Sequence, residues 1–210
     1  LAPVRQLLPD FTFAPFHDSD RSPIASQRRY YELAYREYRD PLFAALTTPR
    51  DDAWSLFWGA DEVSVDKAAI QFPTTNDESE GLAILRDDAN ETVLMLDYGP
   101  GSTGHNHPSK LNIVLYAGGD IRLVDGGRLA YGNPMHDKCF TQTIAHNTVV
   151  VNGKTQKRTR GVLKAYASTP DFDVIRATCD TAYEGVTLDR TVLRRGNVFL
   201  DIFQCTAEKD

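Results

Sequence analysis

The stretch GHNHPSKLNIVLYAGGDIRLVDG, residues 104–126, decides the fold that this sequence predicts. Its middle, from Leu111 to Tyr116, is a run of apolar residues that is typical of a strand. Gly118-Gly119-Asp120 then indicates a turn, and Ile121–Val124 indicates the returning strand. The stretch therefore predicts a β-hairpin with antiparallel strands.

Candidate metal ligands flank this hairpin. In a strand, residues i and i+2 share a face, so His105 and His107 are expected to point the same way. The hairpin would fold Asp125, which follows the second strand, back beside His107. A third strand starting at His146 would complete a site of two histidines and one carboxylate, a ligand set that suits zinc. The alternative is three unrelated polar residues at strand ends.

Strand signals continue through most of the chain after residue 60. Runs of β-forming residues between Asp, Asn and Gly clusters predict further strands at 81–86, 92–98, 146–151, 161–167, 172–177, 186–194 and 198–205. About ten strands at regular spacing indicate a mainly β protein, built as a large antiparallel sandwich or barrel.

The first sixty residues carry helical signals instead. Ser22-Pro23 fits the N-cap and first helical position, and four residues then recur at helical spacing: Tyr31, Ala34, Tyr35 and Tyr38. Two shorter helices are predicted, one after Pro41 and one over 51–59, which opens with two aspartates. Three short helices with large aromatics on one side need a partner to bury those side chains.

Composition sets the outer limits. The 210 residues fit one large domain or one domain with part of another, and we expect a helical segment over 1–61 and a β domain over 62–210. The net charge of −6 argues against a nucleic-acid partner, and no segment approaches the ~20 apolar residues of a membrane span. Three widely spaced cysteines imply no disulfide framework. The start, Leu1-Ala2-Pro3, looks like a chain that begins inside a longer one.

A cupin-type metal enzyme is a second possibility. Such small β-barrels also carry His-x-His on a strand after a Gly-rich loop, and they add a Glu three or four residues after the second His. Here those positions hold Leu111 and Asn112, neither of which supplies a carboxylate. The cupin interpretation loses its third ligand and ranks second.

Several motifs taken together resemble the heparinase II/III-like polysaccharide lyases, and most closely their oligoalginate-lyase-like branch. The resemblance spans roughly residues 80 to 195, in the same order and with similar intervals. Its motifs are Asp97–Gly101, Gly104–Asn112, Leu123–Gly127 with Tyr131-Gly132, and Thr143–Val151. The family implies an N-terminal α/α toroid followed by a large antiparallel β-sandwich, a supersandwich. Phe16–Ser19 also resembles a segment found late in that toroid.

The resemblance implies roles for particular residues. His107, Asp125 and His146 match the positions that bind one zinc ion in the family, and His105 matches a histidine in the substrate cleft. Two further residues, Arg128 and Tyr131, lie where family members place substrate-facing side chains. The chain departs from many relatives at Ser109, where they carry an Asp, which removes an expected carboxylate near His107.

The family's chemistry suits these residue types. Lyases cleave a uronate chain by β-elimination, which requires the substrate carboxylate to be neutralised before the C5 proton can leave. His105 and Tyr131 would serve as base, acid or neutralising group, and Arg128 as a carboxylate clamp. The alternatives without a catalytic role are that Arg128 is a solvated turn residue and that Tyr131 is a buried aromatic residue that packs beside the hairpin. Isolated in the sequence, His17 and His136 receive no role.

The resemblance also implies that this chain alone lacks some catalytic residues. In the family further catalytic residues come from the toroid, of which these residues would cover only the end. We expect the isolated chain to fold and bind zinc but to have little or no lyase activity on an acidic polysaccharide. The alternative is a non-catalytic module in which zinc braces a sandwich that binds sugar or packs against a partner. Family members commonly act outside the bacterial cytoplasm, so the resemblance favours a periplasmic or secreted location.

Overall fold

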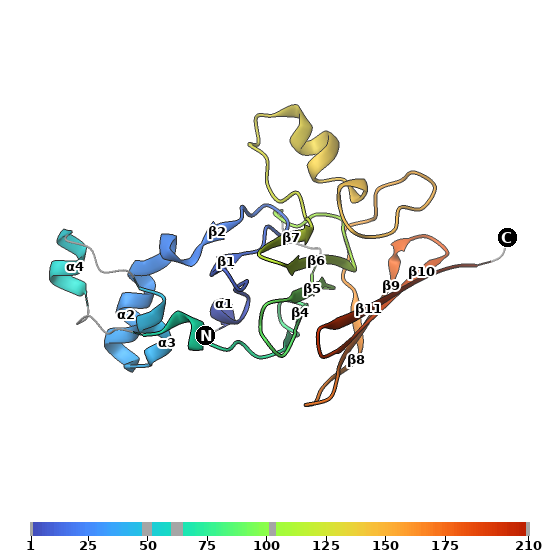
Figure 1. Ribbon diagram of the computed structural model, residues 1–210. Helices are drawn as coiled ribbons and strands as arrows, with labels where there is room; N and C mark the ends of the chain where they lie inside the picture. Colours follow the sequence, from blue (N-terminus) through green and yellow to red (C-terminus); the bar gives the residue numbers. More distant parts are fainter. Residues whose placement is uncertain (1, 48–51, 60–64, 101–103, 209–210) are drawn as a thin grey trace.

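The computed structural model describes residues 2–47, 52–59, 65–100 and 104–208. The chain is mainly β, with 35% strand and 21% helix, and its strands are antiparallel. Helices α2 (Arg28–Tyr38), α3 (Pro41–Ala45) and α4 (Ala53–Trp58) lie at one end of the molecule, a five-stranded sheet lies in the middle, and a four-stranded sheet lies at the other end (Figure 1). A further short helix, η3 (His136–Phe140), lies in the connection that follows the five-stranded sheet. A long connection between β7 and β8 passes over one side of both sheets.

The central sheet is formed by five sequential strands paired in the order β3-β4-β5-β6-β7. They are β3 (Thr75–Asp77), β4 (Leu82–Arg86), β5 (Val93–Asp97), β6 (Asn112–Ala117) and β7 (Asp120–Leu123). The predicted hairpin is confirmed as β6 and β7. Every residue of β5 is buried, because both faces of this sheet are covered.

The second sheet has the order β11-β10-β9-β8. Its strands are β8 (Val162–Ser168), β9 (Asp173–Tyr183), β10 (Val186–Arg195) and β11 (Val198–Ala207). Two-residue turns join the last three strands, and each contains a glycine with positive φ, Gly185 at 66° and Gly196 at 58°. The predicted strands at 161–167, 172–177, 186–194 and 198–205 are therefore confirmed, with β9 longer than expected.

The two sheets pack face to face around one apolar core. Alternate residues of the central sheet, such as Leu85 and Leu96, meet Ile175, Leu188 and Val192 of the second sheet. The opposite face of the central sheet is covered by Leu8, Ala14 and Phe16 from the N-terminal segment. This arrangement confirms the predicted antiparallel β-sandwich with a helical segment before it.

The helical segment has its own small core. Its elements are α1 (Ala2–Arg5), β1 (Thr12–Phe13), β2 (Ser22–Pro23), η1 (Ile24–Gln27), α2 (Arg28–Tyr38), α3 (Pro41–Ala45), α4 (Ala53–Trp58) and η2 (Lys67–Ala69). Tyr31 and Phe43 pack together in this core, whereas Tyr38 is exposed. The predicted domain boundary at 61/62 and the aspartate at 51 lie outside the described residues.

The predicted helix cap at Ser22-Pro23 is wrong. These residues pair with Thr12-Phe13 in a short antiparallel ribbon, and the α-helix begins only at Arg28. The pairing satisfies the backbone groups that a helix start would otherwise leave free. The third helix is confirmed as α4, where the Asp52 side chain accepts a hydrogen bond from Ser55 N, but its Leu56 and Phe57 remain exposed.

Arg190 ties the second sheet to the loops above the core. Its guanidinium is buried, forms a bidentate pair with Asp201, and donates to the backbone carbonyls of Leu111 and Asn147. Arg190→Ala is expected to lower the free energy of unfolding by about 2–4 kcal/mol, because two carbonyls and a carboxylate lose their donor. Urea denaturation measures the loss.

A neighbouring arginine supplies the control for this variant. Arg176 pairs with Asp189 on the same sheet, but its side chain is half exposed, so Arg176→Ala is expected to cost less than about 1 kcal/mol. Equal losses for the two variants would contradict the structural role given to Arg190.

Candidate active site

Three residues far apart in the sequence converge on one buried point. His107 Nδ1 lies 3.2 Å from His146 Nε2, and His146 Nε2 lies 3.7 Å from Asp125 Oδ1. One ligand atom from each residue lies within 4.8 Å of the others, and all three residues are buried. The sequence predicted this convergence.

The route to the convergence differs from the prediction. His107 precedes β6 in a loop, and His146 follows a 3-10 turn, η4 (Thr143–Ala145), so neither lies on a strand. The predicted strand at 146–151 is absent from the described residues, which show there a single backbone bridge between Val151 and Lys154. Hydrogen bonds from side chains take the place of the backbone hydrogen bonds that a strand would make there.

Asn112 and Asn147 make the most important of these replacements. Asn112 Oδ1 accepts from the backbone of Asn147 at 2.8 Å, and Asn147 Nδ2 donates to Ile113 O at 2.8 Å. The segment after His146 is thereby attached to β6 by amide side chains, because backbone groups that leave a sheet still need partners.

The hydrogen bonds around the two histidines define which nitrogen of each ring is free. His146 Nδ1 lies 2.9 Å from Gln142 O, which can only accept, so Nδ1 carries the proton and Nε2 keeps a lone pair. His107 Nε2 lies 3.0 Å from Asp18 Oδ1, which leaves a lone pair on Nδ1. These two lone pairs face each other beside a carboxylate, an arrangement that favours a cation between them.

Electrostatics lead to the same conclusion. Burial raises the pKa of Asp125 to about 6, although Gly127 N donates to its Oδ1 at 2.8 Å. Burial also lowers the pKa values of His107 and His146, so both rings are neutral near pH 7. Two neutral imidazoles and one carboxylate fit a zinc ion with one coordination position left open.

Asn112 holds the carboxylate of the cluster in place. Its Nδ2 donates to Asp125 Oδ2 at 2.7 Å, which leaves Oδ1 toward the histidines. Asn112→Ala is therefore expected to lower zinc affinity 10- to 100-fold, as measured by competition with a chromogenic chelator. Asn197→Ala, at an exposed turn of the second sheet, is the matched control. Unchanged affinity in Asn112→Ala would contradict this positioning.

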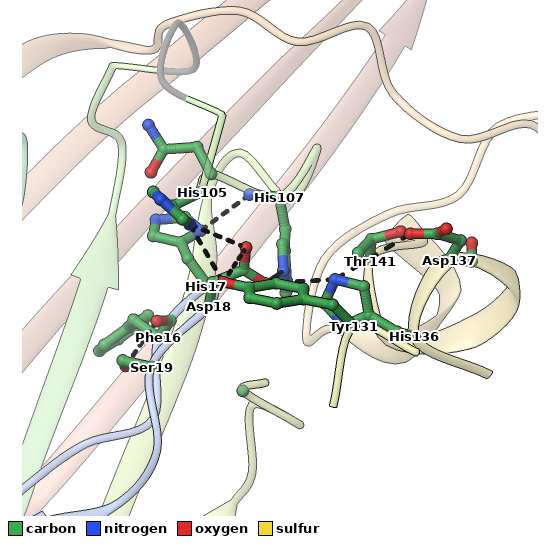
Figure 2. Close-up of polar contacts among 12 residues, drawn as sticks. Phe16, His17, Asp18, Ser19, His105, His107, Tyr131, His136, Asp137 and Thr141 are labelled. Carbon is green, nitrogen blue, oxygen red and sulfur yellow. Dashed lines mark hydrogen bonds and ion pairs between the residues drawn. The ribbon is translucent and has the colours of Figure 1, made fainter. Parts of the chain in front are cut away.

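A second group of residues lies at the surface beside the buried cluster. Tyr131 Oη lies 3.3 Å from His105 Nδ1, and both groups approach Asp18 Oδ2 (Figure 2). The side chain of His105 is 78% exposed, whereas that of His107 is 1% exposed. The expectation that the two histidines share a face is wrong, because they lie in a loop and not in a strand.

A cavity of about 360 Å³ opens at this group. It is lined by Asp18, Gly104, His105, His107, Tyr131, His136, Asp137, Thr141 and Arg158. Arg128 is not among these lining residues. Its guanidinium pairs with Asp20 at 2.5 Å, and its pKa is raised by Asp20 and by Tyr131, which places it next to the Tyr131 side of the cavity.

Three residues without a predicted role belong to the site. Asp18 contacts both histidine groups, and His136 Nε2 lies 3.5 Å from Asp18 Oδ1. His17 accepts a hydrogen bond from His107 N at 3.1 Å, and its Nε2 lies 3.3 Å from Asp97. Asp18 also supplies the carboxylate that seemed missing at Ser109. Its motif, Phe16–Ser19, was visible in the sequence, but a separation of 89 residues from His107 hid the contact.

Comparison with known proteins shows the family of this chain. The family model for the heparinase II/III-like C-terminal domain matches residues 77–204. The chain belongs to the heparinase II/III-like family. The matched residues include strands β4 to β7 of the central sheet, the long connection between β7 and β8, and most of the second sheet. Both histidine motifs lie within the match. A search of curated proteins finds no match.

Solved structures share the fold at low sequence identity. The heparan sulfate lyase HepC from Pedobacter heparinus is 20% identical with a TM-score of 0.79, and the match covers 99% of this chain and 32% of that one. A heparinase III, the BT4657 gene product, is 17% identical with a TM-score of 0.78, covering 98% and 31%. This chain thus spans about a third of the length of these proteins. Among its described residues, no helix has the length and apolar character to cross a bilayer.

Proposed function

We propose that this heparinase II/III-like chain is the β portion of a polysaccharide lyase that cleaves a uronate-containing chain by β-elimination. The observation that carries the proposal is the pairing of exposed His105 and Tyr131 on one carboxylate, at a cavity beside a buried two-histidine, one-aspartate cluster. An acid–base pair at a surface opening is what abstraction of a proton from a sugar ring requires.

His105 and Tyr131 would divide the proton transfers. Donation from His105 Nδ1 to Asp18 leaves Nε2 as the acceptor that can take the C5 proton or face the substrate carboxylate. The Tyr131 hydroxyl, 3.5 Å from Asp18, is a second group that could accept the C5 proton or donate a proton to the leaving O4. Arg128 beside Tyr131, and Arg158 in the cavity wall, would bind the acidic groups of the sugar.

We propose that one zinc ion is held by His107, Asp125 and His146. When bound, it supplies a fixed positive charge that joins the loop before β6, the end of β7 and the segment after η4. Hydrogen bonds within this chain orient the three ligands: Asn112 orients Asp125, Gln142 orients His146, and Asp18 orients His107.

The substrate class and setting are part of the same proposal. An alginate- or heparan-like polymer, or its oligosaccharides, supplies both the uronate and the negative charge that the arginines select. An oligoalginate-lyase-like branch remains our preference from the sequence motifs. A helical toroid of the same polypeptide would contribute further catalytic groups, in a periplasmic or secreted enzyme.

The test measures formation of unsaturated uronate in the ultraviolet. A polypeptide containing this chain with its toroid is incubated with alginate, heparan sulfate and hyaluronan, and with neutral amylose as the control. We expect absorbing product from at least one uronate polymer, none from amylose, and little or none when residues 1–210 are used alone. Binding of the polymers without any product would favour the non-catalytic module, and rapid product formation by 1–210 alone would contradict the need for a toroid.

A further inference from the structure

We propose that Asp18 is a shared positioning residue, whose two carboxylate oxygens orient the metal-facing His107 and the substrate-facing His105 at the same time. The inference rests on the proposed function for its catalytic consequence, but its geometry stands independently. Asp18 would thus connect the buried metal-binding cluster directly with the surface pair of His105 and Tyr131.

The contacts of Asp18 divide cleanly between its two oxygens. Oδ1 lies 3.0 Å from His107 Nε2 and 3.5 Å from His136 Nε2, whereas Oδ2 lies 3.2 Å from His105 Nδ1 and 3.5 Å from Tyr131 Oη. Figure 2 shows the carboxylate between these rings. The side chain is 7% exposed, so these groups take the place of water around it. The two oxygens offer about four acceptor sites, enough for the hydrogen bonds with His107, His105 and Tyr131.

The backbone holds Asp18 against the His-x-His loop. Asp18 N donates to His105 O at 3.2 Å, and the adjacent His17 ring accepts from His107 N. His17 has a positive φ of 54°, a conformation that a non-glycine residue keeps only when its surroundings impose it. The loop and the Asp18 segment are therefore attached at two backbone points as well as through the carboxylate.

The contacts of Asp18 determine which nitrogen of each ring carries a proton. An acceptor-only carboxylate that lies 3.0 Å from one ring nitrogen and 3.2 Å from the other favours an N–H on both rings. His107 must then direct a lone pair at the metal position, and His105 must keep Nε2 free at the surface. One side chain thus selects the tautomer of two functionally different histidines.

Asp18→Asn tests the sharing directly. The amide has nearly the same shape but offers one acceptor oxygen and one NH₂ donor, so it can satisfy only one of the two rings in its original tautomer. Zinc requires the His107 lone pair, so we expect the oxygen to stay with His107 and the NH₂ to face His105. His105 should then switch its proton from Nδ1 to Nε2.

The readout is the ring-nitrogen NMR spectrum of the zinc-loaded protein, in which only five histidines contribute. We expect the His105 tautomer to change in Asp18→Asn and zinc affinity to fall 10- to 100-fold by chelator competition. Asp120→Asn, an exposed carboxylate paired with Arg21, is the matched control and should change neither. Circular dichroism confirms that each variant is folded.

Two outcomes would overturn the sharing. Unchanged tautomers at both rings would show that Asp18 does not select them, and a change in zinc affinity without any change at His105 would confine Asp18 to the metal side. Neither readout depends on turnover, so absence of lyase activity in the parent would refute the proposed function and leave this test intact. Where the parent is active, Asp18→Asn should lower kcat more than it raises KM.

Discussion

Replacing His105 by alanine in the proposed toroid-containing lyase is expected to lower turnover about 10²- to 10⁴-fold while leaving its zinc content unchanged. The His105 side chain is 78% exposed, and its nitrogen contacts are to Asp18 and Tyr131, with no contact to His146 or Asp125. Its loss therefore removes a proton-transfer group without removing a ligand. Turnover is followed by ultraviolet absorbance of the unsaturated product, and zinc by elemental analysis.

His107→Ala provides the contrast that makes the His105 result informative. This variant removes a buried candidate ligand, so both zinc content and thermal stability should fall along with turnover. His105→Gln, which retains a polar side chain of similar reach, should stay as inactive as the alanine variant if proton transfer is the role. A small change in turnover for His105→Ala would instead support a zinc-braced module that takes no part in catalysis.

The sandwich was predictable because its signals are local. Gly118-Gly119-Asp120 and Gly196-Asn197 mark tight turns, and the apolar runs on either side of each turn fix the register of the paired strands. The prediction failed at Ser22-Pro23 and at 146–151, where the backbone is satisfied by a distant ribbon or by asparagine side chains. The secondary-structure propensity of a segment does not indicate which distant residues will form hydrogen bonds with its backbone.

The candidate site was predicted in part for a similar reason. His107 and Asp125 are brought together by a hairpin of known geometry, so their meeting followed from the turn. Asp18, His17 and His136 reach the same place through tertiary contacts between segments up to 118 residues apart, from His136 to Asp18. The resemblance of Phe16–Ser19 to a family segment pointed to the stretch that contains His17 and Asp18, but it did not indicate which side chains they would contact. His136 had no such signal.

Zinc affinity is expected to be nearly constant above about pH 6.5 and to fall about tenfold for each pH unit below 6. Without a cation beside it, the folded protein holds Asp125 with a pKa raised by burial to about 6. Below that pH each zinc ion must displace one proton from this carboxylate. Burial lowers the pKa values of His107 and His146, so their rings are neutral near pH 7 and bind protons less readily than free imidazole.

The measurement is competition with a chelator of known protonation behaviour at a series of pH values. Asp125→Asn is the matched variant, since an amide keeps the shape but cannot bind a proton in this range. We expect its affinity to be lower at neutral pH and to lose the tenfold slope between pH 5 and 6. A slope that persists in Asp125→Asn would place the competing proton on a histidine and contradict burial as the cause of the raised Asp125 pKa. A wild-type affinity independent of pH down to 5 would contradict the raised pKa of Asp125.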